Sequence, residues 1–142
     1  MEVEQIVVQL KEKISGAIHC IVTKEFAKIL EYVKLGEEQK VDGKSDLESM
    51  KDWEKVINGQ LALCEEEDDE GLYSHPLKVD EFDETLCEDD LDECAEELLE
   101  EGETCISYQL RSNGEVIDYL TNEFRVELSQ EQVIEVFWSI NG

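Results

Sequence analysis

The first hydrophobic pattern along the chain has the spacing of an amphipathic helix. Apolar positions recur at steps of three and four residues at Val3, Ile6, Val7, Leu10 and Ile14. This period places them on one face of an α-helix, and Ser15-Gly16 is its predicted end. Residues 17–22, with the sequence AIHCIV, fit either a strand or a continuation of the same helix.

A second helix is predicted over residues 24–35, with Thr23 as its cap and Gly36 just beyond its end. Its apolar stripe consists of Phe26, Ile29, Leu30 and Val33. The polar residues 36–44 are expected to form a loop.

Residues 45–48 match a capping box, in which the Ser45 and Glu48 side chains each satisfy a free backbone N–H. A third helix should follow, with an end at Asn58-Gly59. Residues 60–64 are then a strand candidate, and residues 65–79 are a loop that we expect to be mobile, because its carboxylates repel one another and it has no apolar period. The apolar face of the third helix is expected to contain Leu47, Met50, Trp53, Val56 and Ile57.

The last third of the chain changes from a helical period to alternation. A fourth helix is predicted from about Asp83 to Glu101, with Gly102 as its stop. Residues 105–111 and 115–120 then alternate around Ser112-Asn113-Gly114, a strong hairpin signal. Residues 124–128 are a third strand candidate, and Ser129 to Gln132 resembles a second capping box that opens a C-terminal helix or buried segment. The apolar stripe of the fourth helix would be Cys87, Leu91, Cys94, Ala95 and Leu98.

These elements predict an α+β fold in which four to five helices pack on a small antiparallel sheet with a C-terminal β-hairpin. A chain of 142 residues fits a single domain that buries roughly two thirds of its unfolded surface. We divide it into a helical part (1–60), an acidic loop and helix (61–104), and a part with hairpin, strands and C-terminal helix (105–142). The N-terminus does not resemble a signal peptide and no stretch of about 18 apolar residues occurs, so we expect a cytoplasmic protein, in the host cytoplasm if it is phage-encoded.

Charge adds the feature that helix and strand patterns do not explain. The net charge is −26, and residues 61–104 contain 20 acidic residues and one basic residue, Lys78. The first 60 residues carry 12 acidic and 9 basic residues. The acidity is therefore local, and it should repel nucleic acid and attract basic proteins.

Motifs for chemistry are absent from the sequence. The five cysteines lack the close-spaced pairs of a structural zinc site, and no glycine lies between Gly71 and Gly102 to form an EF-hand loop. The two histidines, His19 and His75, belong to no catalytic motif. We therefore predict no enzyme activity, no catalytic residues, no cofactor and no metal site, and leave open only weak divalent-cation binding along the acidic residues.

As one helix, residues 80–101 would place a carboxylate about every 2.5 Å along roughly 33 Å, comparable with about 1.7 Å per charge in duplex DNA. It would also contain eight like-charge pairs at four-residue spacing, at a cost of roughly 2 to 4 kcal/mol. Exposed Phe82 or Leu86 could add apolar contacts. The predicted partner-binding residues are Asp80, Glu81, Asp83, Glu84, Glu88, Asp89, Asp90, Asp92, Glu93, Glu96, Glu97, Glu100 and Glu101.

The expected function is that of an inhibitor that occupies the basic nucleic-acid groove of another protein, such as a nuclease or an effector complex. In charge strategy alone, the segment resembles phage-encoded DNA mimics that act against restriction or CRISPR effectors, and acidic immunity proteins against nuclease toxins. Two alternatives are an acidic chaperone or adaptor that shields a basic partner without inhibiting it, and a solvated acidic face with no specific partner.

Overall fold

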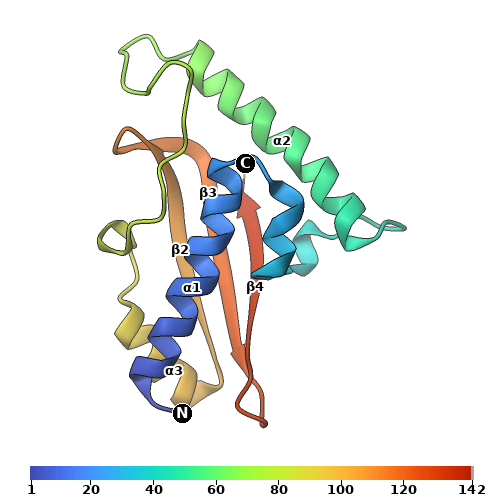
Figure 1. Ribbon diagram of the computed structural model, residues 1–142, viewed down its shortest axis with the longest axis vertical. Helices are drawn as coiled ribbons and strands as arrows, with labels where there is room; N and C mark the ends of the chain where they lie inside the picture. The colour runs from blue at the N-terminus through green and yellow to red at the C-terminus, as the bar shows by residue number, and fades with distance from the viewer. Residues whose placement is uncertain (142) are drawn as a thin grey trace.

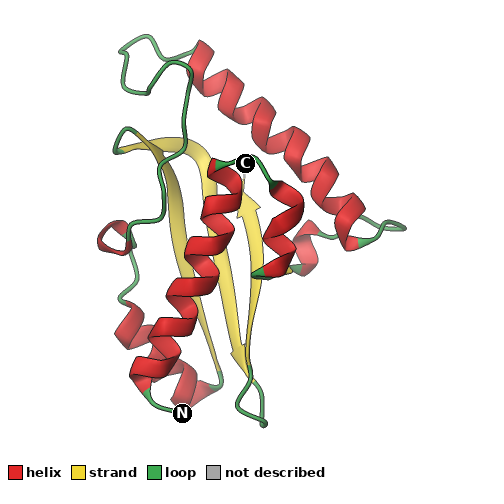
Figure 2. Ribbon diagram, in the orientation of Figure 1, coloured by secondary structure: helices red, strands yellow, loops and turns green. Residues whose placement is uncertain are grey.

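The computed structural model describes residues 1–141, except for the side chains of residues 118 and 119. Within this range, three α-helices and three short 3-10 helices accompany a four-stranded sheet of order β1-β4-β3-β2 (Figure 1, Figure 2). The predicted α+β class is confirmed. The elements are α1 (Val3–Val22), η1 (Phe26–Glu31), β1 (Lys34–Leu35), η2 (Glu37–Gln39), α2 (Asp46–Glu66), η3 (Glu84–Leu86), α3 (Leu91–Glu101), β2 (Glu103–Ser112), β3 (Glu115–Leu128) and β4 (Ile134–Asn141).

The sheet is antiparallel through its three long strands and gains one short parallel strand at an edge. The predicted hairpin is confirmed: β2 and β3 are joined at Asn113 and Gly114, which have φ of 53° and 81°. Positive φ at both positions matches the right-handed twist of the paired strands. The predicted third strand at residues 124–128 is the second half of β3, and β1 pairs with β4 in parallel.

Helix α1 does not end at Ser15-Gly16 as predicted, and it continues through residues 17–22. Glycine inside a helix costs about 1 kcal/mol relative to alanine, but Ala17, Ile18, Cys20 and Ile21 are buried in the core. A Cβ at residue 16 would lie 2.2 Å from Cδ1 of the Tyr32 ring. The glycine therefore permits a close contact and does not terminate the helix.

The helix predicted over residues 24–35 is the 3-10 helix η1 followed by strand β1. Thr23 caps the C-terminus of α1, where its hydroxyl donates to the His19 carbonyl at 3.1 Å. Phe26, Ile29 and Val33 are buried as expected. The segment leaves the helical path because Lys34 and Leu35 pair with β4 and Gly36 N donates to the Trp138 carbonyl at 2.7 Å.

Helix α2 begins as predicted and ends later than predicted. The Ser45 hydroxyl accepts from Glu48 N and the Glu48 carboxylate accepts from Ser45 N, both at 3.2 Å. Asn58-Gly59 does not stop the helix and residues 60–64 are not a strand, because buried Leu61 continues the stripe of Met50 and Ile57.

The C-terminal segment is strand β4, so the predicted capping box at residues 129–132 and the helical alternative after it are wrong. The other alternative, a buried segment, agrees with the alternating burial of this strand. Residues 129–133 form a turn in which Ser129 N donates to the Val133 carbonyl at 3.0 Å. Apolar side chains alternate along β4, at Ile134, Val136, Trp138 and Ile140, and all four are buried. That period of two matches pairing with β3 and would divide these residues between opposite sides of a helix.

Helix α1 covers one face of the sheet, where its buried residues join those of the strands in one core (Figure 1). Helix α3 packs beside it along the edge formed by β2, and α2 extends the helical layer past one end of the strands (Figure 1). The opposite face of the long strands is open to solvent, and it carries the strand residues whose side chains point away from the core. No helix among residues 1–141 is long and apolar enough to cross a membrane.

Candidate functional site

The acidic segment, residues 80–101, is not one helix. Residues 80–90 run as an irregular segment that contains η3, and only residues 91–101 form α3. The helix predicted from Asp83 is therefore wrong for its first eight residues, and the acidic helix is about 16 Å long instead of 33 Å. The predicted stop at Gly102 is confirmed, with a left-handed φ of 81°.

Aspartates stabilise the irregular backbone of residues 80–90, because their short side chains accept hydrogen bonds from nearby backbone N–H groups. Asp83 Oδ1 accepts from Thr85 N at 3.0 Å, and Asp90 Oδ1 accepts from Asp92 N at 2.8 Å and Glu93 N at 3.3 Å. Asp90 is thus the N-cap of α3. These bonds hold Asp83 and Asp90 in non-helical conformations, at positions where the sequence pattern predicted a helix.

Two more aspartates connect the segment to the sheet. Asp80 accepts from Asn113 N at 3.0 Å and Gly114 N at 2.8 Å, which ties the segment to the hairpin turn. Asp89 Oδ2 accepts from Ser107 N at 2.8 Å. Asp89 therefore satisfies a backbone N–H at the β2 edge that would otherwise be available for pairing with another chain, and Asp80 satisfies two N–H groups of the hairpin turn.

Phe82 anchors the segment to the core and is not displayed for a partner. Its ring packs edge-on against Tyr108 at a centroid distance of 4.8 Å, and Asp83 N donates to the Tyr108 hydroxyl at 3.2 Å. Leu86 remains 39% exposed. Of the two apolar residues suggested from the sequence, Phe82 is partly buried and Leu86 is exposed.

Three of the predicted glutamates have partners within the chain. Glu81 lies 2.6 Å from His19 Nδ1 and Glu84 lies 2.8 Å from Lys11 Nζ, both on α1. Glu97 accepts from the Thr104 hydroxyl at 3.1 Å. The Lys11–Glu84 ion pair and the His19–Glu81 contact are about half exposed and contribute little stability, but they orient their carboxylates toward the protein.

Six of the thirteen predicted residues have a carboxylate that makes no hydrogen bond or ion pair with another residue in the described range. We call them the unpartnered carboxylates: Glu88, Asp92, Glu93, Glu96, Glu100 and Glu101. All but Glu88 lie on α3, and all are exposed.

Helix α3 keeps these carboxylates at an energetic cost. Four of the eight like-charge pairs expected from the sequence lie within it, and together they destabilise the helix by about 1 to 2 kcal/mol. Its last turn contains Glu100 and Glu101 and no basic residue, although the negative end of the helix dipole favours cations. The helix forms because Leu91, Cys94, Ala95 and Leu98 are buried against α1 and the sheet.

Of the two cysteines in the acidic segment, Cys94 is buried and Cys87 is partly buried. Burial raises the pKa of Cys94 to about 11, so this thiol is protonated at neutral pH. Cys87 Sγ donates to the Ser107 carbonyl at 3.6 Å. Among the described residues, no group of three or more His, Cys, Asp or Glu side chains could hold a metal ion.

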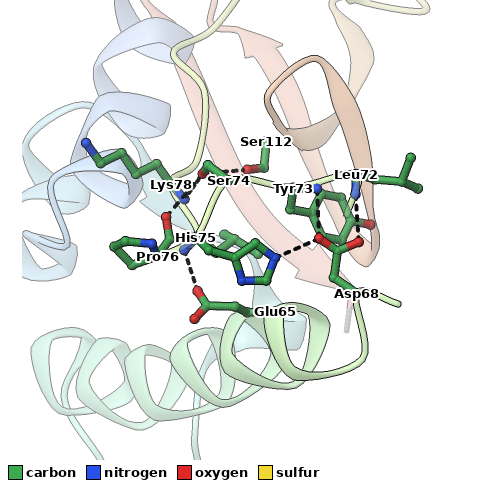
Figure 3. A network of polar contacts seen from close by, with 10 residues as sticks. Glu65, Asp68, Leu72, Tyr73, Ser74, His75, Pro76, Lys78 and Ser112 are labelled. Atoms are coloured by element: carbon green, nitrogen blue, oxygen red, sulfur yellow. Dashed lines mark hydrogen bonds and ion pairs between the residues drawn. The ribbon is translucent and has the colours of Figure 1, made fainter. Parts of the chain in front are cut away.

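Residues 67–79 form a loop that is cross-linked by polar contacts (Figure 3). The Asp68 carboxylate accepts from Leu72 N at 2.8 Å and Tyr73 N at 2.9 Å, and it lies 3.0 Å from His75 Nε2. Burial raises the pKa of Asp68, but the three hydrogen bonds outweigh it and hold the pKa below its usual value. The expected mobility of this loop stays a prediction.

The open sheet face is a second acidic surface, which the sequence analysis missed. It consists of the solvent-side positions of the three long strands, chiefly Glu103, Cys105, Ser107, Glu123, Arg125, Glu127, Glu135, Phe137 and Ser139. Glu103 lies opposite Glu127, which lies opposite Glu135, so three glutamates form a row across three strands. The alternation of polar and apolar residues over residues 121–128 is the sequence signal that could have predicted this polar face.

A hollow of about 300 Å³ lies on the open sheet face next to α3. One wall is the Phe137 ring, with the Arg125 guanidinium carbon 4.8 Å and Lys34 Nζ 5.9 Å from its centroid. Four glutamates line the hollow: Glu38, Glu97, Glu103 and Glu123.

Comparisons with known proteins find no relative of this chain. No family model matches the chain, and neither a curated protein nor a solved structure matches it. The class that the fold and the surface define is an α+β protein with an unbalanced acidic surface.

Proposed function

We propose that the protein binds a basic surface of another protein, in the groove where that partner binds nucleic acid, and competes with the nucleic acid for it. The observation that carries this proposal is the set of unpartnered carboxylates, five of which the fold displays on α3 in spite of their mutual repulsion. A helix needed only for packing would be more stable with lysines at several of these positions.

The spacing of the carboxylates on α3 supports competition with phosphates. Six acidic side chains along about 16 Å correspond to one charge per roughly 2.7 Å, against about 1.7 Å in duplex DNA. Neighbours one helical turn apart are separated by about 5 to 6 Å. A groove lined by lysine and arginine can therefore contact several of them together.

Exposed apolar residues can add selectivity, because charge alone discriminates poorly among basic proteins. Leu99 lies on the outer side of α3 and is 39% exposed, as is Leu86 in the preceding segment. Leu86 precedes the unpartnered carboxylates in the chain, and Leu99 lies among them, between Glu96 and Glu100. Together these residues describe a short acidic ridge with two exposed apolar contacts.

The test is a displacement assay with a basic protein captured from the source cells and then purified. Labelled duplex DNA or RNA is bound to this partner, and its release by the parent protein is compared with release by the variant Asp92→Lys/Glu93→Lys/Glu96→Lys/Glu100→Lys. This variant should remain folded, because the repulsion it relieves between carboxylates offsets the loss of Asp92 and Glu93 from the positive N-terminal end of the helix. It should no longer displace the nucleic acid.

The matched control is Glu4→Lys/Glu66→Lys/Glu115→Lys/Glu131→Lys, which makes the same charge change at exposed positions outside the ridge. It should displace nucleic acid nearly as well as the parent protein. If the α3 variant displaces equally well, α3 is not the binding surface. If partner, protein and nucleic acid form a ternary complex, the protein is an adaptor and not an inhibitor.

A further inference from the structure

The open sheet face has no packing role, yet it carries charges that destabilise the sheet. Glutamates directly opposite one another on neighbouring strands repel, and here three stand in one row, Glu103, Glu127 and Glu135. Lys34 pairs with Glu135 at 2.6 Å, whereas Glu103 and Glu127 have no partner within the described residues. This arrangement indicates a surface that is completed by cations from outside the chain.

The hollow on this face combines free carboxylates with an aromatic wall that already binds cations. Arg125 stacks on Phe137 and makes no ion pair with a described residue, although Glu123 and Glu127 are its neighbours on the same side of β3. The carboxylates of Glu103 and Glu123 therefore remain available. A Cβ at Gly36 would lie 2.9 Å from Glu38 Oε2, so a third carboxylate lies close over this border of the hollow.

We propose that this hollow receives an arginine side chain of the basic partner, placed between the Glu103 and Glu123 carboxylates and against the Phe137 ring. A guanidinium suits the site because it is planar, donates to two carboxylates at once, and stacks on aromatic and guanidinium planes. Lysine offers a point charge without the stacking surface. The inference rests on the proposed function, since the basic partner supplies the arginine.

The charge of the hollow excludes other occupants. Four glutamates against one arginine repel nucleic acid and anionic ligands. A second copy of this chain would bring its own glutamate row against the first. A volume of about 300 Å³ is at the lower limit for small-molecule pockets, which suits a single long side chain. The hollow also borders α3 at Glu97, so one basic surface can cover both.

The experiment is a titration of the full chain with an acetylated, amidated tetra-arginine peptide, followed by amide NMR and calorimetry. Residues 103–105, 123–125 and 137–139 should shift, and the variant Glu103→Gln/Glu123→Gln should bind about tenfold or more weakly. The control Glu115→Gln/Glu131→Gln, with the same charge change at exposed positions, should lose about twofold or less. Tetra-lysine should bind several-fold more weakly than tetra-arginine.

Each alternative result contradicts a different part of the argument. If shifts are confined to α3 and Glu103→Gln/Glu123→Gln behaves like its control, the arginine site is wrong while the proposed function can stand. Equal binding of tetra-lysine would refute recognition of the guanidinium. If the peptide occupies the hollow but the displacement assay fails, the proposed function is wrong and the cation site remains.

Discussion

In residues 80–90, six of the seven carboxylates bond to another residue of the chain, and in α3 only one of six does. The two regions are adjacent and similarly acidic, with seven and six carboxylates, but the first is bonded to β2, the hairpin turn and α1, whereas the second is displayed. The difference follows from side-chain length and backbone shape. Aspartates in an irregular segment reach backbone N–H groups, whereas glutamates on an outer helix face point into water. Acidic composition alone therefore does not identify a binding surface.

The largest effect expected from this comparison is on stability, at two adjacent residues. Asp89→Ala removes the acceptor of Ser107 N and should lower the free energy of unfolding by about 1 to 3 kcal/mol. Glu88→Ala, one residue earlier and without a partner, should change it by less than about 0.5 kcal/mol. Urea unfolding of both variants measures the difference, and equal effects would mean that Asp89 does not hold the β2 edge.

A smaller effect of opposite sign is expected on α3. Glu96→Lys removes the repulsion with Asp92 and Glu100 and replaces it with attraction, so it should stabilise the protein by about 0.5 to 1 kcal/mol at low salt. The gain should shrink as salt screens these exposed charges. Thermal unfolding at two salt concentrations measures it, and a destabilised variant would show that Glu96 has a structural role.

The smallest expected effect is on the acid titration of Asp83 in the irregular segment. Hydrogen bonds from the Thr85 hydroxyl and backbone N–H hold the pKa of Asp83 below its usual value. Its contribution to stability is therefore fully present above the unfolded pKa and is lost as pH falls through the lower, folded pKa. Carboxyl NMR should show the Asp83 pKa rising in Thr85→Val, while Thr121→Val, a distant control, leaves it unchanged.

Local patterns predicted the features that depend on neighbouring residues. The Ser45 capping box, the hairpin at Asn113-Gly114, the αL residue Gly102 and the buried stripe of α3 are all present. The acidic residues were also correctly singled out as unbalanced. Their division into structural and displayed carboxylates was not predictable, because it depends on where the β2 edge and α1 lie in space.

The sequence by itself determined the α+β class, the hairpin and the local excess of negative charge, since these follow from period, turn chemistry and composition. Tertiary structure decided that helices α1 and α2 continue through Gly16 and Gly59, because burial of the following residues outweighs a glycine cost of about 1 kcal/mol. It also decided that residues 134–141 form a strand and that residues 83–90 are not a helix. In both cases the β-sheet supplies backbone hydrogen-bond partners for the segment, and local propensity does not contain that information. Because no helix covers the other face of the sheet, that face forms the second acidic surface.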